Sequence, residues 1–413
     1  MLALKTQEFV STSAEHYDLL HSQQRGVSIV WEKTAAHGKK SWHKLAPDSP
    51  EIPFILAAQQ GKEDRYVTVN EFHAWRVVRQ LKSLRSLFVD IDASLQLDEL
   101  LDALACAKLP APNFIMHTGR GLHAYWLHAP VPAQALPVWQ RCQDTIIAAL
   151  ASVGADKAAK DCARVLRLAG SVNSKTGTHV HGLVLDPEPW VFRDLCDEIL
   201  GHRVAHEKPP AKVRSIDAAR ASKGARPSTG SIYDRWYLVY QDLLAIARWY
   251  DFGGIPEHHR NNWLFACAVA LSWFAHPETL EAELVGQARV WTPYLTEKEV
   301  RAAYQSPLER ARMAAEGKTI EWQGMDIDPR YRMRRSTLYE LLQPIIPPAL
   351  ERTLRAVISD ETRKEHKRET DAKRWDKSRD AYLAENNASA LKPWEALGIS
   401  RRTYYRRKAL GSL

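Results

Sequence analysis

The sequence predicts an α+β domain, followed by an all-α helical domain and a small helix-turn-helix. Two observations lead to this fold class. Strand-like segments are mixed with helical segments in the first part of the chain, whereas from residue 233 onward the strand signal disappears. We therefore divide the chain into an α+β domain (1–202), a linker (203–232), a helical domain (233–345), a charged helical tether (346–385) and the helix-turn-helix (386–413).

The elements of the α+β domain follow from their periodicity. The segments "GVSIVWEK", "RYVTVNEF" and "THVHGLVLD" alternate as half-buried strands do. The segments "LDELLDALACAKL" and "PVWQRCQDTIIAALASVGA" have the helical period, and Gly154 closes the second. The segment "NFIMHTGRGLHAYWLHA" predicts a β-hairpin with a glycine-rich turn.

The linker and the helical domain are set apart by composition. Residues 203–232 are polar, punctuated by Pro and Gly, and without period. Helical segments then follow one another, and the second begins near Arg260. Thr296 and Glu299 form a capping-box signature at the start of the fourth. Residues 361–385 mix dense charge of both signs, which indicates a solvated helix or tether.

The composition limits the class of protein. A chain of 413 residues is long enough for two or three domains. No apolar run reaches the ~18 residues of a membrane span, and no signal-type segment begins the chain, so we expect a cytoplasmic protein with no membrane partner. The 5 cysteines are scattered without a C-x-x-C pair, which favours neither a zinc site nor a disulfide framework. The net charge of +8 permits a nucleic-acid partner, and much of the surplus lies in the last third.

The segment "SLFVDID" places Asp90 and Asp92 at the end of an apolar strand. Residues i and i+2 of a strand point to the same face, with their Cα atoms ~6.5–7 Å apart. Repulsion between two such carboxylates is relieved by protonation, by neighbouring cations or by a metal ion. Mg²⁺ and Mn²⁺ favour one or two carboxylates together with water and substrate phosphates. A strand that ends at a polar turn, capped by Asp92, explains the same pattern. Other segments are therefore needed to choose between a metal site and a plain strand end.

The hairpin segment "HTGRGLHAYW" can complete a site. Gly119 and Gly121 permit a positive φ and a close backbone approach to a ligand. Arg120 lies at the tip, and His123 begins the returning strand, where it can donate to a phosphate oxygen. An ordinary hairpin in which His123 packs on Tyr125 is the alternative.

A third segment, "GADKAAKDCARVLRLAGSVNSKTG", brings carboxylates and cations together. Asp156 and Asp161 precede Arg164, Arg167 and Lys175. A metal ion would neutralise the carboxylates while the cations hold substrate phosphates. Surface ion pairs are the alternative explanation for each arginine.

Taken together, the three segments resemble the archaeo-eukaryotic primase superfamily, in the branch of primase-polymerases carried by plasmids and other mobile elements. The matching motifs are an apolar strand ending D-x-D ("LFVDID"), a glycine-rich hairpin ending in His ("TGRGLH") and the segment "DCARVLRLAGSVN". They occur in the family's order within about residues 86–177. The resemblance implies that the α+β domain has the fold of this superfamily, with an RRM-like sheet and helices.

The resemblance also implies roles for individual residues. Asp90, Asp92 and Asp161 would bind two catalytic divalent ions, Mg²⁺ or Mn²⁺, and His123 would contact the phosphates of the incoming nucleoside triphosphate. The further candidates for holding the triphosphate are Arg120, Gly121 through its backbone, Arg164, Arg167 and Lys175.

Two positions depart from the family pattern. Many members have a small hydroxyl residue where this chain has Gly121, and many have Pro where it has Ala169. The first departure removes a side-chain hydroxyl from the triphosphate, although backbone N–H groups can substitute for it.

The last residues carry a second resemblance. "LKPWEALGISRRTYYRRK" is similar to the C-terminal DNA-binding segment of plasmid Rep initiators that supply their own primase. A short helix ends at Gly398, and Ser400 caps the next helix. A frayed basic tail is the alternative, although Trp394, Leu397 and Ile399 supply a small core. The candidate DNA-binding residues of the second helix are Arg401, Arg402, Tyr404, Tyr405, Arg406, Arg407 and Lys408.

We therefore expect a replication protein of a plasmid or other mobile element. It would synthesise primers on a single-stranded DNA template from nucleoside triphosphates and bind double-stranded origin DNA. No GxxxxGK[ST] motif occurs, so a separate helicase and the host replication polymerase would be its partners. A non-catalytic initiator and a metal-dependent nuclease stay open as alternatives. The sequence does not distinguish ribonucleotides from deoxyribonucleotides, nor does it fix the template sequence or the oligomeric state.

Overall fold

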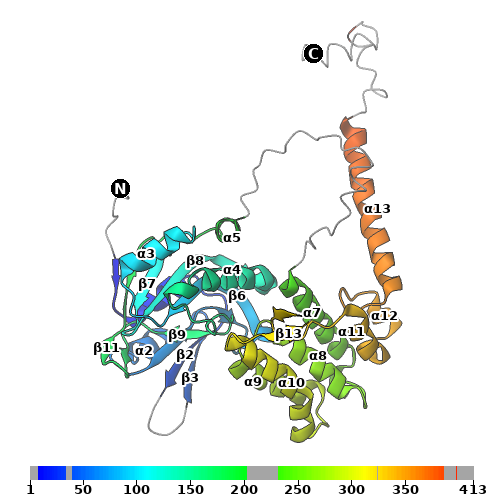
Figure 1. The fold of residues 1–413 in the computed structure, drawn as a ribbon, viewed down its shortest axis with the longest axis horizontal. Helices are drawn as coiled ribbons and strands as arrows, with labels where there is room; N and C mark the ends of the chain where they lie inside the picture. The colour runs from blue at the N-terminus through cyan, green and yellow to red at the C-terminus, as the bar shows by residue number, and fades with distance from the viewer. Residues whose placement is uncertain (1–7, 34–39, 202–230, 323, 386–396, 398–413) are drawn as a thin grey trace. The chain divides into compact units, whose positions relative to one another are not determined.

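The computed structural model describes residues 8–33, 40–201, 231–322, 324–385 and 397 (Figure 1). The contacts within the chain divide it into two units, Met1–Ile346 and Pro347–Leu413. The first unit contains both the α+β portion and the helical portion that the sequence predicts. No helix among the described residues is long and apolar enough to cross a membrane.

A six-stranded antiparallel sheet forms the centre of the α+β portion. Strands β6 and β8 are the longest, with 11 residues each, and they pair over most of their length. The predicted hairpin is confirmed, because β7 pairs with β8 across the turn at 118–121. In spatial order the strands are β1 (Glu8–Val10), β12 (His181–Val184), β7 (Phe114–His117), β8 (Leu122–Pro132), β6 (Leu81–Ile91) and β5 (Glu71–Phe72).

Helix α4 (Leu136–Ala149) packs against β6, the strand that ends in the two aspartates. The Trp139 indole donates to the Ser86 carbonyl at 3.0 Å, and the Gln143 amide bonds both the N–H and the C=O of Phe88. Side chains of α4 thus hydrogen-bond to the backbone of β6, a strand whose own side chains are buried almost throughout. The other helices of this portion are α1 (Ser13–His21), α2 (Ile52–Ala57), α3 (Leu97–Cys106) and α5 (Phe192–Leu200).

A second, four-stranded antiparallel sheet completes the α+β portion. Its strands are short, and three of them come from the first third of the chain. In spatial order they are β3 (Lys40–Leu45), β2 (Ser28–Lys33), β4 (Arg65–Thr68) and β9 (Val165–Arg167). A small hairpin of β10 (Val172–Asn173) and β11 (Thr178–His179) follows β9.

The helical portion contains the helices that the sequence predicts. Helix α8 begins at Arg260, as predicted, and Thr296 and Glu299 form the predicted capping box. The helices are α7 (Ile232–Trp249), α8 (Arg260–Leu271), α9 (Pro277–Trp291), α10 (Glu297–Ala315) and α11 (Arg335–Leu342).

The expectation that strands are absent after residue 233 was wrong. A two-stranded hairpin, β13 (Ile320–Trp322) and β14 (Met325–Ile327), follows α10. Each strand has only three residues, which is too short for an alternating pattern to be recognised in the sequence. The predicted all-α class therefore holds for this portion except at this hairpin.

Buried hydrogen bonds join the helical portion to the α+β portion. The carboxylate of Glu283 in α9 is buried, and it accepts the backbone N–H groups of Val78 and Arg79, each at 3.0 Å. These residues begin η1 (Val78–Gln80), the single turn of 3-10 helix before β6. Tyr233 of α7 also donates to Asp144 of α4. Glu283 thus caps a short helix of the other portion.

The second unit is dominated by one long helix. After α12 (Pro348–Glu351), helix α13 runs over Asp360–Glu385. Glu351 accepts from the backbone of Ser359 and from the Thr362 hydroxyl at the start of α13. The charged segment 361–385 is thus helical, as one of the two readings of its sequence predicted.

Candidate active site

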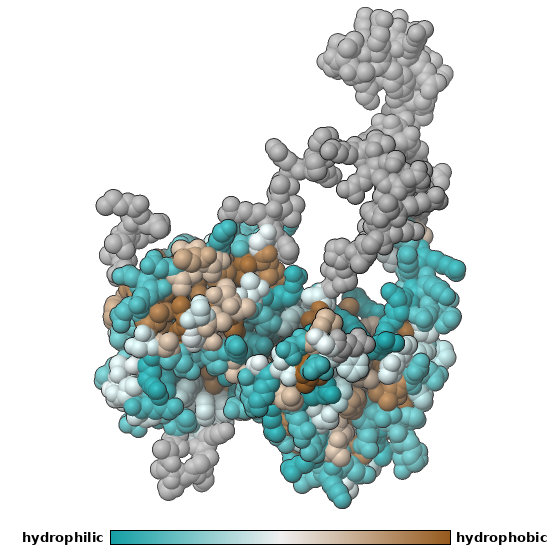
Figure 2. Space-filling view, in the orientation of Figure 1, coloured by the Kyte–Doolittle hydropathy of each residue, from teal (hydrophilic) through white to brown (hydrophobic). Residues whose placement is uncertain are grey.

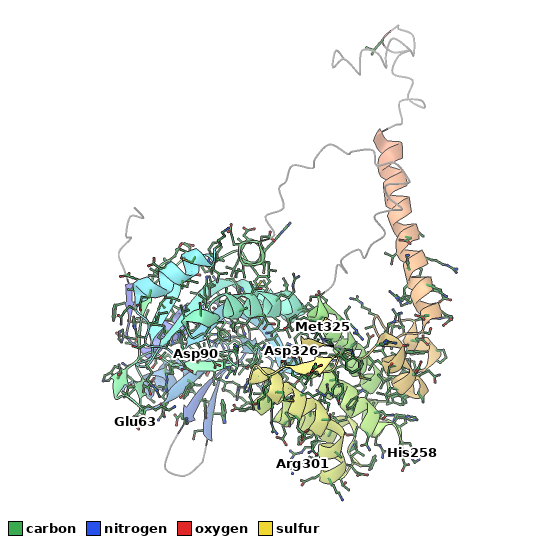
Figure 3. The ribbon with its side chains drawn as sticks, in the orientation of Figure 1. Glu63, Asp90, His258, Arg301, Met325 and Asp326 are labelled. Carbon is green, nitrogen blue, oxygen red and sulfur yellow. The ribbon has the colours of Figure 1, made fainter. Side chains whose placement is uncertain are left out.

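The ends of two neighbouring strands place the first two motifs side by side. Asp90 is the penultimate residue of β6, Asp92 follows the strand, and His123 is the second residue of β8. Asp90 and His123 are direct cross-strand partners. His123 Nε2 lies 3.3 Å from Asp90 Oδ1, while His123 Nδ1 lies 3.2 Å from the Tyr125 hydroxyl. His123 therefore both faces the aspartate and contacts Tyr125. Figure 3 labels Asp90 among the strands of the α+β portion.

Segment 154–156 fixes the other side of the same strand end. The Asp156 N–H donates to the Asp90 carbonyl at 2.7 Å, and the Asp92 N–H donates to the Gly154 carbonyl at 3.3 Å. Ile91 and Ala155 form an isolated bridge between these two bonds. The backbone that carries both carboxylates is thus held on both sides.

The two aspartates differ in electrostatic character. Burial opposes ionisation of Asp90, but the charge and the hydrogen bond of His123 hold its pKa below the usual value. Burial raises the pKa of Asp92, and the carboxylates of Asp90 and Asp156 add to that rise. Asp92 accepts no hydrogen bond and forms no ion pair among the described residues. The site thus has one carboxylate compensated by histidine and one that other carboxylates repel.

Cationic side chains from three segments line the pocket in front of these carboxylates. The pocket has about 340 Å³ of open volume. Arg120 and Lys175 line it from exposed loops, and Arg167 lines it from β9. Its lining residues are Tyr66, Asp90, Asp92, Thr118, Arg120, His123, Val165, Leu166, Arg167, Asn173 and Lys175. The structure thus brings the first two motifs and most of the predicted cations to one pocket.

The turn before His123 has no room for a side chain at Gly121. A Cβ atom there would stand 1.8 Å from the Ile91 carbonyl oxygen, at the end of the aspartate strand. The Gly121 carbonyl accepts from both the backbone and the hydroxyl of Thr118, each at 3.0 Å. Gly121 therefore lets the turn approach β6 closely, and the hydroxyl in the pocket is that of Thr118.

The second departure, Ala169, also has a local explanation. The Ala169 N–H donates to Nδ1 of the buried His16 at 3.2 Å, a bond that proline cannot make. Burial lowers the pKa of His16 to about 3, so the ring is neutral and Nδ1 can accept. Segment 168–170 is thereby attached to α1.

Asp161 and Arg164 lie apart from the residues that line this pocket. The Asp161 carboxylate is buried, accepts the Ala163 N–H at 3.1 Å and pairs with Arg164 Nε at 3.1 Å. Arg164 also donates to the Ala158 carbonyl. Asp161 lines a separate small cavity together with His276 and Arg330 of the helical portion. Arg164 still contributes to the low pKa of Asp90.

The donor set fits a divalent cation in part. Asp90 and Asp92 offer carboxylate oxygens at the pocket wall. The pKa of Asp92 is raised mainly by burial and further by the neighbouring carboxylates, whose charge a cation would offset. No group of three or more His, Cys, Asp or Glu side chains within the described part of the chain is close enough to hold a metal ion. A site that includes Asp161 therefore stays a prediction.

Sequence reasoning missed several residues that shape the pocket. Asp64 accepts from Arg167 at 2.8 Å and from the Ser174 hydroxyl at 2.5 Å, and these bonds hold its pKa below the usual value against the effect of burial. Tyr66 lies under the Arg167 guanidinium, 5.1 Å from it. Asn173 donates to the Thr118 carbonyl at 2.6 Å. Asp64 and Arg167 are 103 residues apart, so no local pattern could have paired them.

The predicted DNA-binding residues of the C-terminal module lie outside the described residues. Only Leu397 of residues 386–413 is described, and its side chain is exposed. The helix-turn-helix thus stays a prediction from the sequence.

Comparison with known proteins adds an independent observation. No family model matches the chain. A replication protein from Clostridium perfringens is 27% identical over 347 residues, which cover 79% of this chain and 75% of the relative.

Among solved structures, the chain is similar to the archaeo-eukaryotic primase domain of a primase-polymerase from cyanophage S-2L, with 21% identity and a TM-score of 0.36 over 46% of this chain and 96% of that one. The primase RepB′ is 18% identical, with a TM-score of 0.31 over 74% of this chain and 93% of that one. The chain is a homologue of a replication protein and is similar to it over most of its length.

Proposed function

We propose that the protein is a DNA primase-polymerase that synthesises primers on single-stranded DNA during replication of a plasmid or other mobile element. The observation that carries this proposal is the pocket in which Asp90, Asp92 and His123 face three cations. A nucleoside triphosphate presents four negative charges at most along three phosphates, and a pocket with carboxylates on one wall and cations on the other suits it together with a divalent cation.

Individual residues have distinct parts in this proposal. Arg167, held in place by Asp64, and the exposed Arg120 and Lys175 bind the phosphates. His123 donates from Nε2 to a phosphate oxygen when nucleotide is bound, and its Nδ1 contact with the Tyr125 hydroxyl fixes the ring. Backbone N–H groups of the turn at 119–121 supply donors where other members supply a hydroxyl.

Asp90 and Asp92, with Asp161 as a further candidate, would hold Mg²⁺ or Mn²⁺. Bound there, these ions would supply charge neutralisation and activation of the attacking 3′ hydroxyl. The residues of the chain hold the nucleotide in line with that hydroxyl, and the leaving pyrophosphate departs past the cations of the pocket.

Origin binding is proposed for the C-terminal module, on its sequence alone. A helix that opens at Ser400 presents Arg401, Tyr404, Tyr405 and Lys408 along one broad face. Arginine in a major groove reads guanine, and flanking cations hold phosphates. A solved RepB′ catalytic domain is described in complex with initiator DNA, and we propose DNA as a partner of this chain as well.

Two rival functions predict different behaviour. A non-catalytic initiator would bind DNA without incorporating nucleotides. A metal-dependent nuclease would shorten the DNA and would not need a hairpin that binds a triphosphate.

The deciding experiment mixes the full chain with labelled nucleotides, a single-stranded template and Mg²⁺ or Mn²⁺, and separates the products on a gel. Products that grow from nucleotides support the proposal. Shortened template supports the nuclease, and unchanged template with bound protein supports the initiator. Parallel reactions with ribonucleotides and deoxyribonucleotides define the preferred substrate.

A truncation tests the C-terminal assignment separately. Removing residues 386–413 should abolish selective binding to duplex origin DNA while primer synthesis on single strands continues. A truncated chain that still selects its duplex as well as the full chain would assign origin recognition to the helical portion at 233–345.

A further inference from the structure

The four-stranded sheet carries a transverse row of aromatic side chains that the proposed chemistry does not use. Trp42, Trp31 and Tyr66 lie on three adjacent strands as direct cross-strand partners, and Arg167 on the fourth strand is the partner of Tyr66. We call these four residues the aromatic row. Because strands are ~4.8 Å apart, the row is ~14 Å long.

The rings of the row stack on one another, so that their edges are the part left open. Trp31 and Trp42 are stacked, with ring centroids 5.2 Å apart and planes at 14°, and Trp31 and Tyr66 are stacked at 4.8 Å. The Arg167 guanidinium lies over Tyr66, and Arg76 lies 4.6 Å from the Trp42 centroid at the other end. Both ends of the row are thus closed by cations.

The row begins in the candidate active site. Tyr66 and Arg167 line the same pocket as Asp90 and His123. The charge of Asp90 contributes to the raised pKa of Tyr66, although burial is the larger cause. Trp31 and Trp42 therefore continue outward from the place where an incoming nucleotide would lie.

The rings of the row differ in burial from the tryptophans of the core. Trp31, Trp42 and Tyr66 are each half-buried. In contrast, the large tryptophans that serve packing, Trp126 and Trp139, are completely buried. Rings that pack a core lose contact with water, whereas the rings of the row keep part of their surface available to a ligand.

The charge of this face favours a polyanion. Lys33 and Lys44 are exposed on the same face of the strands as the row, and Lys44 lies 5.5 Å from the ring of Trp75, which meets Trp42 edge-on. Among the described side chains of the four strands, no carboxylate lies on this face, because Glu32 projects from the opposite face and pairs with His43. Figure 2 gives the hydropathy of the molecule's visible face for orientation.

We propose that the aromatic row is a binding track for the single-stranded DNA template, whose bases contact the exposed ring edges of Trp31 and Trp42 while Lys33 and Lys44 contact the phosphates. Aromatic side chains flanked by cations bind single strands without strong sequence preference, since every base has a π-face that a ring can contact. This proposal rests on the proposed function, because it assigns the template path of the same site.

The test measures binding of a fluorescently labelled oligothymidylate to the full chain by anisotropy, without added nucleotide. Trp31→Ala and Trp42→Ala should each raise the Kd roughly 5- to 150-fold. Trp42→Phe should keep most of the affinity, because phenylalanine retains a ring. The matched control is Trp249→Ala, which removes a half-exposed tryptophan at the end of α7 and should leave the Kd unchanged.

A surface variant keeps the test decisive if the alanine variants fail to fold. Lys44 is exposed, so Lys44→Gln should fold normally and should reduce the slope of log affinity against log salt by ~0.7. An unchanged slope and affinity in Lys44→Gln would overturn the proposal. Alanine variants that bind like the wild type but melt at a lower temperature would also overturn it, since the row would then serve packing alone.

Nucleotide incorporation by the wild-type chain, measured in parallel, separates this proposal from the one on which it rests. If the wild type incorporates nucleotides and the tryptophan variants bind DNA normally, the template track fails and the enzyme stands. If the wild type incorporates none while the variants lose single-strand affinity, the enzyme fails and the track stands as a DNA-binding surface.

Discussion

The two sheets of the α+β portion contribute opposite chemistry to one pocket. The six-stranded sheet carries Asp90 and His123 on long strands that are buried on both sides. The four-stranded sheet carries Arg167 and Tyr66 on short strands whose aromatic side chains are half-buried. The difference teaches that rigidity and access are divided between the sheets. Asp90 lies on a strand that packing fixes firmly, whereas Arg167 and Tyr66 lie on a smaller sheet whose side chains stay partly open to a ligand.

This comparison predicts which kinetic constant each group controls. The carboxylates on the six-stranded sheet should act mainly on the rate of the chemical step, whereas the groups that contact phosphate, Arg167 and His123, should act mainly on binding. Variants from each sheet can therefore break the comparison or sharpen it.

The largest effect is expected at Asp90. Asp90→Ala should lower the kcat for nucleotide incorporation at least ~100-fold, because the electrostatic group of the reaction is lost. Duplex origin binding by the full chain should stay nearly intact. Product gels and filter binding measure the two activities. Synthesis at the wild-type rate by Asp90→Ala would remove the six-stranded sheet from the chemistry.

A smaller effect, on affinity, is expected at Arg167. A charged hydrogen bond to phosphate contributes roughly 1.5–3 kcal/mol, so Arg167→Ala should weaken nucleotide binding ~10- to 150-fold. His123→Ala should weaken it to a similar degree, since His123 faces the phosphates from the other sheet. Calorimetric titration with nucleotide measures both.

The melting temperature is the control for both variants. Arg167 also pairs with Asp64, so a large loss of stability with unchanged nucleotide affinity would make it a structural ion pair. The same result for His123→Ala would make His123 a core histidine that packs on Tyr125.

Gly121 tests how closely the two strand ends must approach. A Cβ atom at 121 would meet the Ile91 carbonyl, and backbone cannot move aside as a flexible side chain can. Gly121→Ser should therefore cost about 3 kcal/mol of folding free energy, even though serine restores the residue type that many family members have. Urea unfolding measures the cost, and a variant as stable as the wild type would show that the turn can retreat from β6.

The smallest effect concerns the helix that joins the two sheets. His16 of α1 contacts Phe114 and Tyr125 of the six-stranded sheet and accepts the Ala169 N–H beyond β9. Its pKa is about 3 when folded and ~6.5 when unfolded. The unfolded chain binds the proton more readily, so the stability from His16 is present above pH ~6.5 and falls as the pH drops, by about 2 kcal/mol at pH 5.

The matched variant is His16→Gln, whose side-chain oxygen can accept the same N–H without titrating. It should be less sensitive to pH between ~7 and ~5 than the wild type, as measured by chemical unfolding at each pH. Equal pH dependence in the two proteins would place the titration elsewhere, and His128, whose pKa burial lowers to about 4, would be the next candidate.

The two strand ends of the site could be predicted from the sequence. The strand ending at Asp90 and the hairpin leading to His123 are local patterns, an apolar run and a glycine turn, so their strand ends could be found by reading along the chain. Their pairing then brings the two side chains together without further information.

The aromatic row could not be predicted in this way. Its members come from four strands that are separated by loops, and their alignment depends on cross-strand register, which no short segment contains. Strand β3 itself, "KSWHKL", is too polar for its pattern to indicate a strand. The contact between Asp64 and Arg167 and that between His16 and Ala169 are likewise long-range.

The cap that Glu283 places on η1 has a consequence for the order in which the protein is assembled. Val78 and Glu283 are 205 residues apart. At a synthesis rate of roughly 5–20 residues per second, Glu283 is made about 10 to 40 s after Val78. Trp75 and Arg76, next to the outer end of the aromatic row, closely precede this turn. During that time the N–H groups of Val78 and Arg79 lack their Glu283 acceptor. A nascent α+β portion thus lacks the cap on η1, next to the proposed DNA-binding track, until α9 has been synthesised.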